Sequence, residues 1–161
     1  MLTLCDLGAM GVVVTILVLL SFAFAPRAER TAQQVLDQQR ARILQAPTFQ
    51  RQHPDMVRAL TTWKLKPSTE ESHADFAAQT IYIVVSLPSG AHYDSGTLTL
   101  VLLHELVHAA LGPTAAHNAA FFFKEKQGRA ALSADRILPL GAAPNPWYPA
   151  QILDAKDFVF S

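Results

Sequence analysis

The chain has 161 residues, of which 50% are hydrophobic, and this length suits one compact domain but not two of ordinary size. Lys plus Arg and Asp plus Glu number 13 each, so the chain lacks the basic excess with which proteins bind nucleic acid. The single cysteine, Cys5, excludes a disulfide within the chain.

The N-terminal stretch contributes to the low content of charged residues, which is 16%. Residues 7–25, LGAMGVVVTILVLLSFAFA, are 19 positions without a charge, and at about 1.5 Å per residue they are long enough to cross a hydrocarbon core of about 30 Å. A cleaved signal peptide is the alternative, because residues 23–25 resemble a cleavage site, but no Lys or Arg precedes the stretch. The sequence therefore predicts an uncleaved transmembrane anchor over residues 1–26.

Basic residues on the C-terminal side predict the orientation of this anchor. Arg27, Arg30, Arg40 and Arg42 all follow the apolar stretch. By the positive-inside rule, the N-terminus is expected outside and the body in the cytosol or inside a membrane-bound particle. This arrangement is that of a single-pass membrane protein.

The next residues predict a stalk followed by a globular domain. Residues 27–52 are rich in Gln, Arg and Ala, with apolar residues at helical spacing, so we expect an amphipathic helical stalk that ends at Pro47. The remaining residues, 53–161, are expected to form one domain, whose first short helix starts near Pro54. A polar loop, STEESHAD, comes next.

A strand and two helices are predicted in the middle of this domain. Residues 80–85, TIYIVV, are all β-branched or aromatic and precede a Pro-Ser-Gly turn, which is typical of a strand. In the helix that follows, Asp94 or Ser95 caps the first turn and Gly112, followed by proline, ends it. Another helix is expected from about residue 115 to residue 132. A short sheet packed on a helix gives an α+β fold.

The first of these helices contains the pentapeptide HELVH, from His104 to His108. Residues four apart lie on one helix face, so the two imidazoles project side by side at the spacing that a tetrahedral zinc ion needs. Glu105 lies about 100° around the helix, where it can hold a zinc-bound water and act as general base. The flanks are apolar, and unpaired His and Glu would be costly to bury there. The pattern predicts a zinc site of the H-E-x-x-H type.

A third ligand is expected from the chain after the Gly-Pro break. His117 comes nine residues after His108 and can complete a three-histidine site, with the fourth position open as in catalytic zinc sites. The other candidates for this position are Asp94, Asp135 and Asn118, of which the amide is the poorest zinc donor.

Several other aromatic and imidazole side chains are candidates for the cleft. His92 and Tyr93 precede the motif helix, and either could donate a hydrogen bond to an oxyanion, but a packing role is the preferred interpretation. Tyr82 is expected as a strand residue that packs on the core, with a place in the cleft as its alternative. His53 and His73 fall in expected loops, where we expect solvated side chains.

Residues 81–124, IYIVVSLPSGAHYDSGTLTLVLLHELVHAALGPTAAHNAAFFFK, resemble the small zincin-type metallopeptidases of large DNA viruses and algae, which are related in motif to WLM-like and SprT-like proteases. The resemblance implies a strand, a polar loop, the HELVH helix and a histidine before an aromatic-rich helix. It also implies zinc (Zn2+) bound by His104, His108 and His117, with Glu105 as general base. In zincins the strand before the motif helix borders the cleft, so the free edge of TIYIVV is expected to pair with substrate backbone.

Together these features predict an N-terminal transmembrane helix followed by a small zincin-like α+β domain with a short sheet packed on the HExxH helix. The predicted function is a membrane-anchored zinc metallopeptidase that hydrolyses peptide bonds through a zinc-bound water with Glu105 as general base. Its expected partners are a peptide or protein substrate and the membrane, through residues 7–25. The alternative is a membrane-anchored structural protein of a virion, at a viral inner membrane and among virion proteins, with a structural or degenerate zinc site. A closed site with four ligands would favour that alternative.

Overall fold

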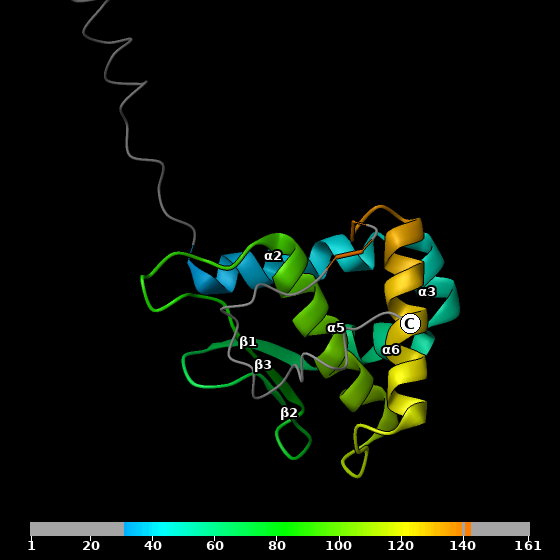
Figure 1. The fold of residues 1–161 in the computed structure, drawn as a ribbon. Helices are drawn as coiled ribbons and strands as arrows, with labels where there is room; N and C mark the ends of the chain where they lie inside the picture. Colours follow the sequence, from blue (N-terminus) through cyan, green and yellow to red (C-terminus); the bar gives the residue numbers. More distant parts are fainter. Residues whose placement is uncertain (1–30, 140, 143–161) are drawn as a thin grey trace, which may run out of the picture. The chain divides into compact units, whose positions relative to one another are not determined.

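The computed structural model describes residues 31–139, 141 and 142. The chain divides into two compact units, Met1–Arg30 and Thr31–Ser161, and the first of these lies outside the described residues. Five helices and three strands are described in the second unit (Figure 1). Their order is α2 (Ala32–Leu44), α3 (Pro47–Gln52), α4 (Pro54–Thr62), β1 (Lys64–Ser68), β2 (His73–Asp75), β3 (Thr80–Val84), α5 (Ser95–Leu111) and α6 (Ala119–Ala134).

The three strands form one sheet in the order β1-β3-β2. β1 runs parallel to β3, with Leu65 opposite Ile81, and β2 runs antiparallel to it, with Ala74 opposite Ile81. Just before β2, the Ser72 hydroxyl accepts a hydrogen bond from the Val84 backbone N–H at 2.9 Å. β3 therefore has partners on both sides, and the expectation that a substrate pairs with a free edge of TIYIVV is wrong. The outer edges of this sheet belong to β1 and β2.

α5 lies between the sheet and α6 and forms the centre of the core (Figure 1). Every residue from Thr97 to Val107 is buried, because apolar side chains occur on all faces of this helix. The helix begins after Asp94, whose carboxylate accepts a hydrogen bond from the Thr97 backbone N–H at 2.9 Å. It ends at Gly112, whose φ of +98° lies in the region that favours glycine.

The N-terminal helices belong to the same body as α5. Leu36 and Ile43 of α2 and Phe49 of α3 are fully buried in the common core. The described part of residues 27–52 is therefore not a stalk, because its amphipathic pattern covers the core of its own domain. Pro47 begins α3, where the missing N–H of proline leaves no helical hydrogen bond unmade.

The described residues contain no helix that is both long and apolar enough to cross a membrane. Residues 7–25 and the predicted anchor, residues 1–26, lie outside the part of the chain that the structure describes. The structure therefore does not support the prediction of a single-pass membrane protein with its N-terminus outside and its body in the cytosol or a virion. The fold class that the structure supports is α+β with a small three-stranded sheet.

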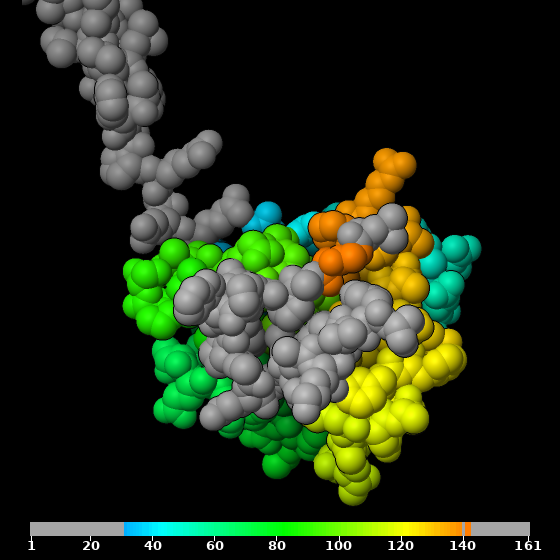
Figure 2. Space-filling model, viewed as in Figure 1, coloured from blue at the N-terminus to red at the C-terminus, as the bar shows by residue number. Residues whose placement is uncertain are grey.

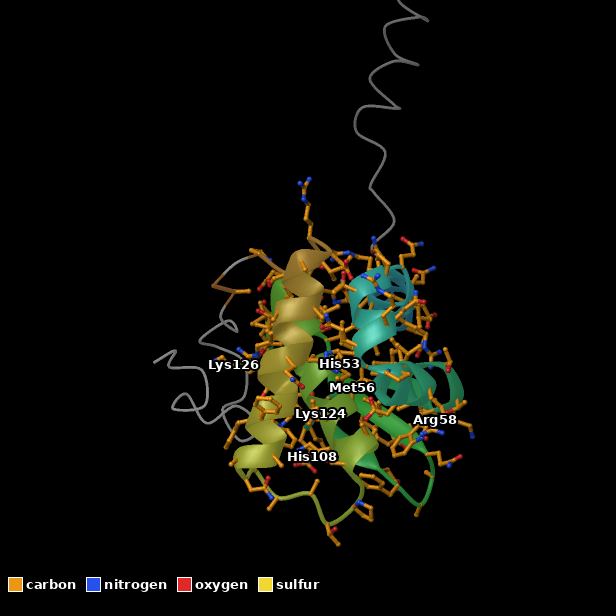
Figure 3. The ribbon with its side chains drawn as sticks, turned by 90° about the vertical axis from the view of Figure 1, so that its right-hand side faces the viewer. His53, Met56, Arg58, His108, Lys124 and Lys126 are labelled. Carbon is orange, nitrogen blue, oxygen red and sulfur yellow. The ribbon has the colours of Figure 1, made fainter. Side chains whose placement is uncertain are left out.

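α6 packs closely on α5 and α4 at Gly128. A Cβ atom added there would lie 2.8 Å from Leu103 Cδ1 and 3.5 Å from Met56 Cε. Both neighbours are fully buried, so neither can move away without disturbing the core. Nearby, Lys124 of α6 forms an ion pair with Asp55 of α4 at 2.5 Å; Met56 and Lys124 are labelled in Figure 3.

We predict that Gly128→Ala destabilises the protein, although alanine is the better helix former by about 1 kcal/mol. The added methyl group overpacks the contact with Leu103, and overpacking of this kind costs about 1–3 kcal/mol. Urea unfolding measures the free energy of unfolding. Lys126→Ala, at an exposed position of the same helix, is the matched control and is expected to be close to neutral. A gain in stability for Gly128→Ala would contradict the close contact.

Candidate metal centre

Three histidines converge at the end of α5. The Nε2 atom of His117 lies 3.1 Å from Nε2 of His104 and 3.1 Å from Nε2 of His108. His104 is buried, His108 is half-buried and His117 is exposed, so the cluster extends from the core to the surface. Figure 3 shows His108 beside the beginning of α6, and Figure 2 shows the loop before α6 (yellow) at the surface of the molecule. The three side chains predicted as metal ligands are thus brought together.

The geometry of these nitrogens fits a metal ion. A single proton on His117 Nε2 can be donated to one of its two neighbours at a time, so hydrogen bonding alone does not account for both short contacts. Nitrogen ligands about 2.0–2.1 Å from a tetrahedral zinc ion are about 3.3 Å apart, which is close to the spacing found here. The three histidines could therefore hold a metal ion through their Nε2 atoms.

The local sequence explains how the third histidine reaches the other two. α5 ends at Gly112, and α6 begins after Asn118, whose side chain accepts hydrogen bonds from the backbone N–H groups of Ala120 at 3.0 Å and Phe121 at 3.1 Å. The loop between the two helices is short, and His117 is its last residue before the helix cap. The cap therefore fixes where the chain presents His117 to the face of α5.

α6 supplies the surroundings of the histidines through an aromatic residue of the expected aromatic-rich helix and through a glutamate that the sequence reasoning did not single out. The ring of Phe121 contacts all three imidazoles, with centroid distances of 4.9, 4.5 and 4.8 Å to His104, His108 and His117. Glu125, one turn later, is buried and places Oε2 3.9 Å from Nδ1 of His104. The sequence could have indicated that Phe121 and Glu125 act together, because side chains four residues apart lie on one face of a helix.

Glu125 also forms an ion pair within α6. The Arg129 guanidinium donates to Glu125 Oε1 at 2.6 Å. Burial alone would raise the pKa of the Glu125 carboxyl, but His104 and Arg129 hold that pKa below its ordinary value. Glu125 is therefore a carboxylate at neutral pH in the interior of the domain.

Glu105 lies next to His104 on α5 and is 2% exposed. Burial, and then the charge of Glu71, raise the pKa of its carboxyl to about 8. Among the described residues no hydrogen bond or ion pair with the Glu105 side chain is found. A cation bound by the histidines would lower this pKa and favour the carboxylate.

His108 is kept unprotonated by its surroundings. Burial lowers the pKa of the imidazole to about 4, with further lowering by His104 and His117, while a backbone hydrogen bond with Ala115 acts in the opposite direction. A metal ion binds the unprotonated nitrogen, so at neutral pH protons do not compete for this ligand.

The alternative ligands considered from the sequence are engaged in helix capping. Asp94 caps α5 and Asn118 caps α6, as described above. Asp135 Oδ2 accepts hydrogen bonds from the backbone N–H groups of Thr48 at 2.8 Å and Phe49 at 3.1 Å, at the start of α3. Within the part of the chain that the structure describes, the cluster has three ligands, and none of these alternatives is among them.

The cleft candidates of the sequence analysis lie away from the cluster. The His92 ring is hydrogen-bonded with Ser86 at 3.0 Å, and Tyr93 is buried before the first turn of α5. Ten residues separate Asp94 from His104, which corresponds to about 15 Å along a helix. His92 and Tyr93 are thus placed at the opposite end of α5, and the structure does not support a role for them in binding an oxyanion.

Two further expectations for aromatic residues have different outcomes. Tyr82 stacks on His73, with ring centroids 4.8 Å apart. His73 is exposed as expected, but it begins strand β2 and does not lie in a loop. Side chains alternate along a strand, so the half-buried Tyr82 faces away from the buried Ile81, and its role as a cleft residue stays a prediction. His53 is buried, with its ring 5.2 Å from that of Phe49, and burial lowers its pKa, so the expectation of a solvated side chain is wrong.

Comparisons with family models, with curated proteins and with solved structures find no match for this chain. The resemblance to zincin-type metallopeptidases therefore stays a prediction, and the arrangement of the histidines is the observation on which a function must be argued.

We predict that the full chain binds one equivalent of zinc and that His117→Ala weakens this binding by more than 10-fold. Removal of a residue that is only hydrogen-bonded to a metal ligand costs about 10- to 100-fold in metal affinity. Removal of a ligand itself is expected to cost more. Competition with a chromophoric chelator measures the affinity. His73→Ala, at an exposed histidine outside the cluster, is the matched control. Equal affinities of parent and His117→Ala would remove His117 from the site.

A second prediction separates capping from metal binding at Asp94. Asp94→Ala should reduce the free energy of unfolding by about 1 kcal/mol, as for other helix caps, and leave zinc affinity unchanged. Asp94→Asn, which keeps a capping oxygen, should restore most of this stability. Weakened zinc binding in Asp94→Ala would instead make this carboxylate a ligand.

The pH dependence of stability provides a further measurement on the same variants. Burial alone would raise the pKa of Asp94, but hydrogen bonds from Thr97 and from the backbone of Gly96 lower it below 3.8. The Asp94 carboxylate therefore stabilises the folded protein fully at pH values above the ordinary pKa of 3.8. This stabilisation is lost as the pH falls through the lowered pKa. Asp94→Ala should lack this part of the acid dependence.

Proposed function

We propose that this protein is a zinc-dependent metallopeptidase, in which His104, His108 and His117 bind the zinc ion and Glu105 acts as general base. The observation that carries the proposal is the convergence of three Nε2 atoms, two of which belong to the helix that also carries Glu105. Three protein ligands with a fourth position open are characteristic of catalytic zinc sites. A peptide or protein is the proposed substrate.

In this mechanism the histidines would bind the metal ion and Glu105 would transfer the proton. A bound zinc ion polarises a carbonyl group and lowers the pKa of water, which makes water a nucleophile at neutral pH. The Glu105 carboxylate would accept the proton of the attacking water and deliver it to the nitrogen of the leaving amine. His104 and His108 would keep the metal on one face of α5, and the loop that carries His117 would close the ligand set.

The burial of Glu105 is consistent with this role. A carboxyl whose pKa is raised by burial is a stronger base once it is ionised, and ionisation is favoured when a cation is near. A structural metal site is the alternative, and it would be favoured by a fourth protein ligand. The cluster offers three ligands among the described residues, and Asp94, Asp135 and Asn118 serve as caps.

We predict that Glu105→Gln retains zinc and loses peptide hydrolysis by at least about 100-fold, the lower range of what general acid–base catalysis contributes. Glutamine has the size of glutamate but cannot accept the proton. Zinc content and cleavage of a peptide library are measured on the same preparation. Glu70→Gln, the same change at an exposed glutamate, is the control and should leave both unchanged. Equal hydrolysis by parent and Glu105→Gln would refute the assignment of the base.

A further inference from the structure

The metal site uses one ring nitrogen of His104, Nε2, and leaves the other, Nδ1, without a partner. Its Nε2 faces the other two histidines, so its Nδ1 points to the opposite side of the ring. This Nδ1 is buried and has no hydrogen bond in the structure, whereas the carboxylate oxygen Oε2 of Glu125 lies 3.9 Å away. His104 and Glu125 are 2% and 3% exposed, so neither group can turn to solvent for a partner.

Metal binding imposes a requirement on this nitrogen. When Nε2 of a neutral imidazole binds a metal ion, the ring proton is on Nδ1, and a buried N–H group needs an acceptor. His108 is hydrogen-bonded with the backbone of Ala115. For His104, the carboxylate of Glu125 is the acceptor that the described residues place within reach.

We propose that Glu125 is a positioning residue that accepts a hydrogen bond from Nδ1–H of His104 and so holds this imidazole with Nε2 turned to the metal. The inference rests on the metal site of the proposed function and not on its hydrolytic step. Closing the distance from 3.9 Å to that of a hydrogen bond requires a small movement of α6 or of the two side chains.

Arg129 completes this arrangement. Its guanidinium donates to Oε1 of Glu125 at 2.6 Å, which leaves Oε2 for His104. Arg129 is one turn beyond Glu125 on α6, and its positive charge compensates a carboxylate that would otherwise be isolated in the core. A series of polar contacts thus connects Arg129 through Glu125 to His104 and the proposed metal position.

The alternative is that Glu125 and Arg129 only fasten α6 to the core. Removing the carboxylate would then lower the stability of the metal-free protein without changing how tightly each folded molecule binds zinc. Metal affinity and the spectrum of a bound ion distinguish the two roles, because they report on the orientation of the ligand.

The experiment uses the full chain with Glu125→Gln and Glu125→Ala, and Glu70→Gln as the control for the same change at an exposed site. Zn2+ affinity is measured by competition with a chelator, and free energies of unfolding are measured on the metal-free proteins. Visible absorption of bound Co2+ reports on ligand geometry. Glu125→Ala is expected to weaken Zn2+ binding by about 10- to 100-fold and to change the Co2+ spectrum.

Glu125→Gln keeps an oxygen that can accept from Nδ1–H, so its loss of affinity should be smaller than that of Glu125→Ala. If Glu125→Ala does not fold, Glu125→Met takes its place, because methionine has a similar size but no oxygen that accepts from Nδ1–H. Zn2+ affinities of both variants within about threefold of the parent would overturn the inference, as would a parent that binds no Zn2+. If the parent binds Zn2+ tightly but cleaves no peptide, the proposed function is refuted. The Zn2+ affinities of the Glu125 variants then still decide the role of Glu125.

Discussion

Burial of α5 on nearly every side is the constraint on which the other elements depend. Its apolar surface is covered by the sheet, by α2, α4 and α6, so each of these elements is placed by its contact with one helix. Burial decreases along its last turns, from His104 in the core to the half-buried His108. The histidine cluster therefore lies where the core helix reaches the surface, and α6 covers it through Phe121 and Glu125.

Much of this region was predictable because its determinants are local. β3 and α5 lie where the β-branched run and the apolar helix predict them, and Asp94 and Gly112 bound the helix through their own backbone preferences. The convergence of His104, His108 and His117 follows from a spacing of four on one helix and a short loop after it. Zinc and the hydrolytic activity remain predictions.

The features that sequence reasoning missed depend on contacts between distant segments. β1 has the sequence KLKPS, with Leu65 as its buried residue, and it is a strand because it lies at the edge of the sheet, where proline is tolerated. The alternative ligand Asp135 turned out to cap α3, which is remote in sequence. The pairing of Glu125 with His104 likewise requires α6 to be docked on α5.

The three histidines lie close together in the sequence, which limits how much a bound ion can stabilise the fold. His104 and His117 are 13 positions apart, so an ion would cross-link only a small loop. Loop-closure entropy grows with the logarithm of loop length, so the restriction of the unfolded chain is modest. The ion would fasten the hairpin of α5 and α6, while α2 and β1 could open without breaking a bond to it. Cohesion of the remaining elements therefore depends on the apolar core.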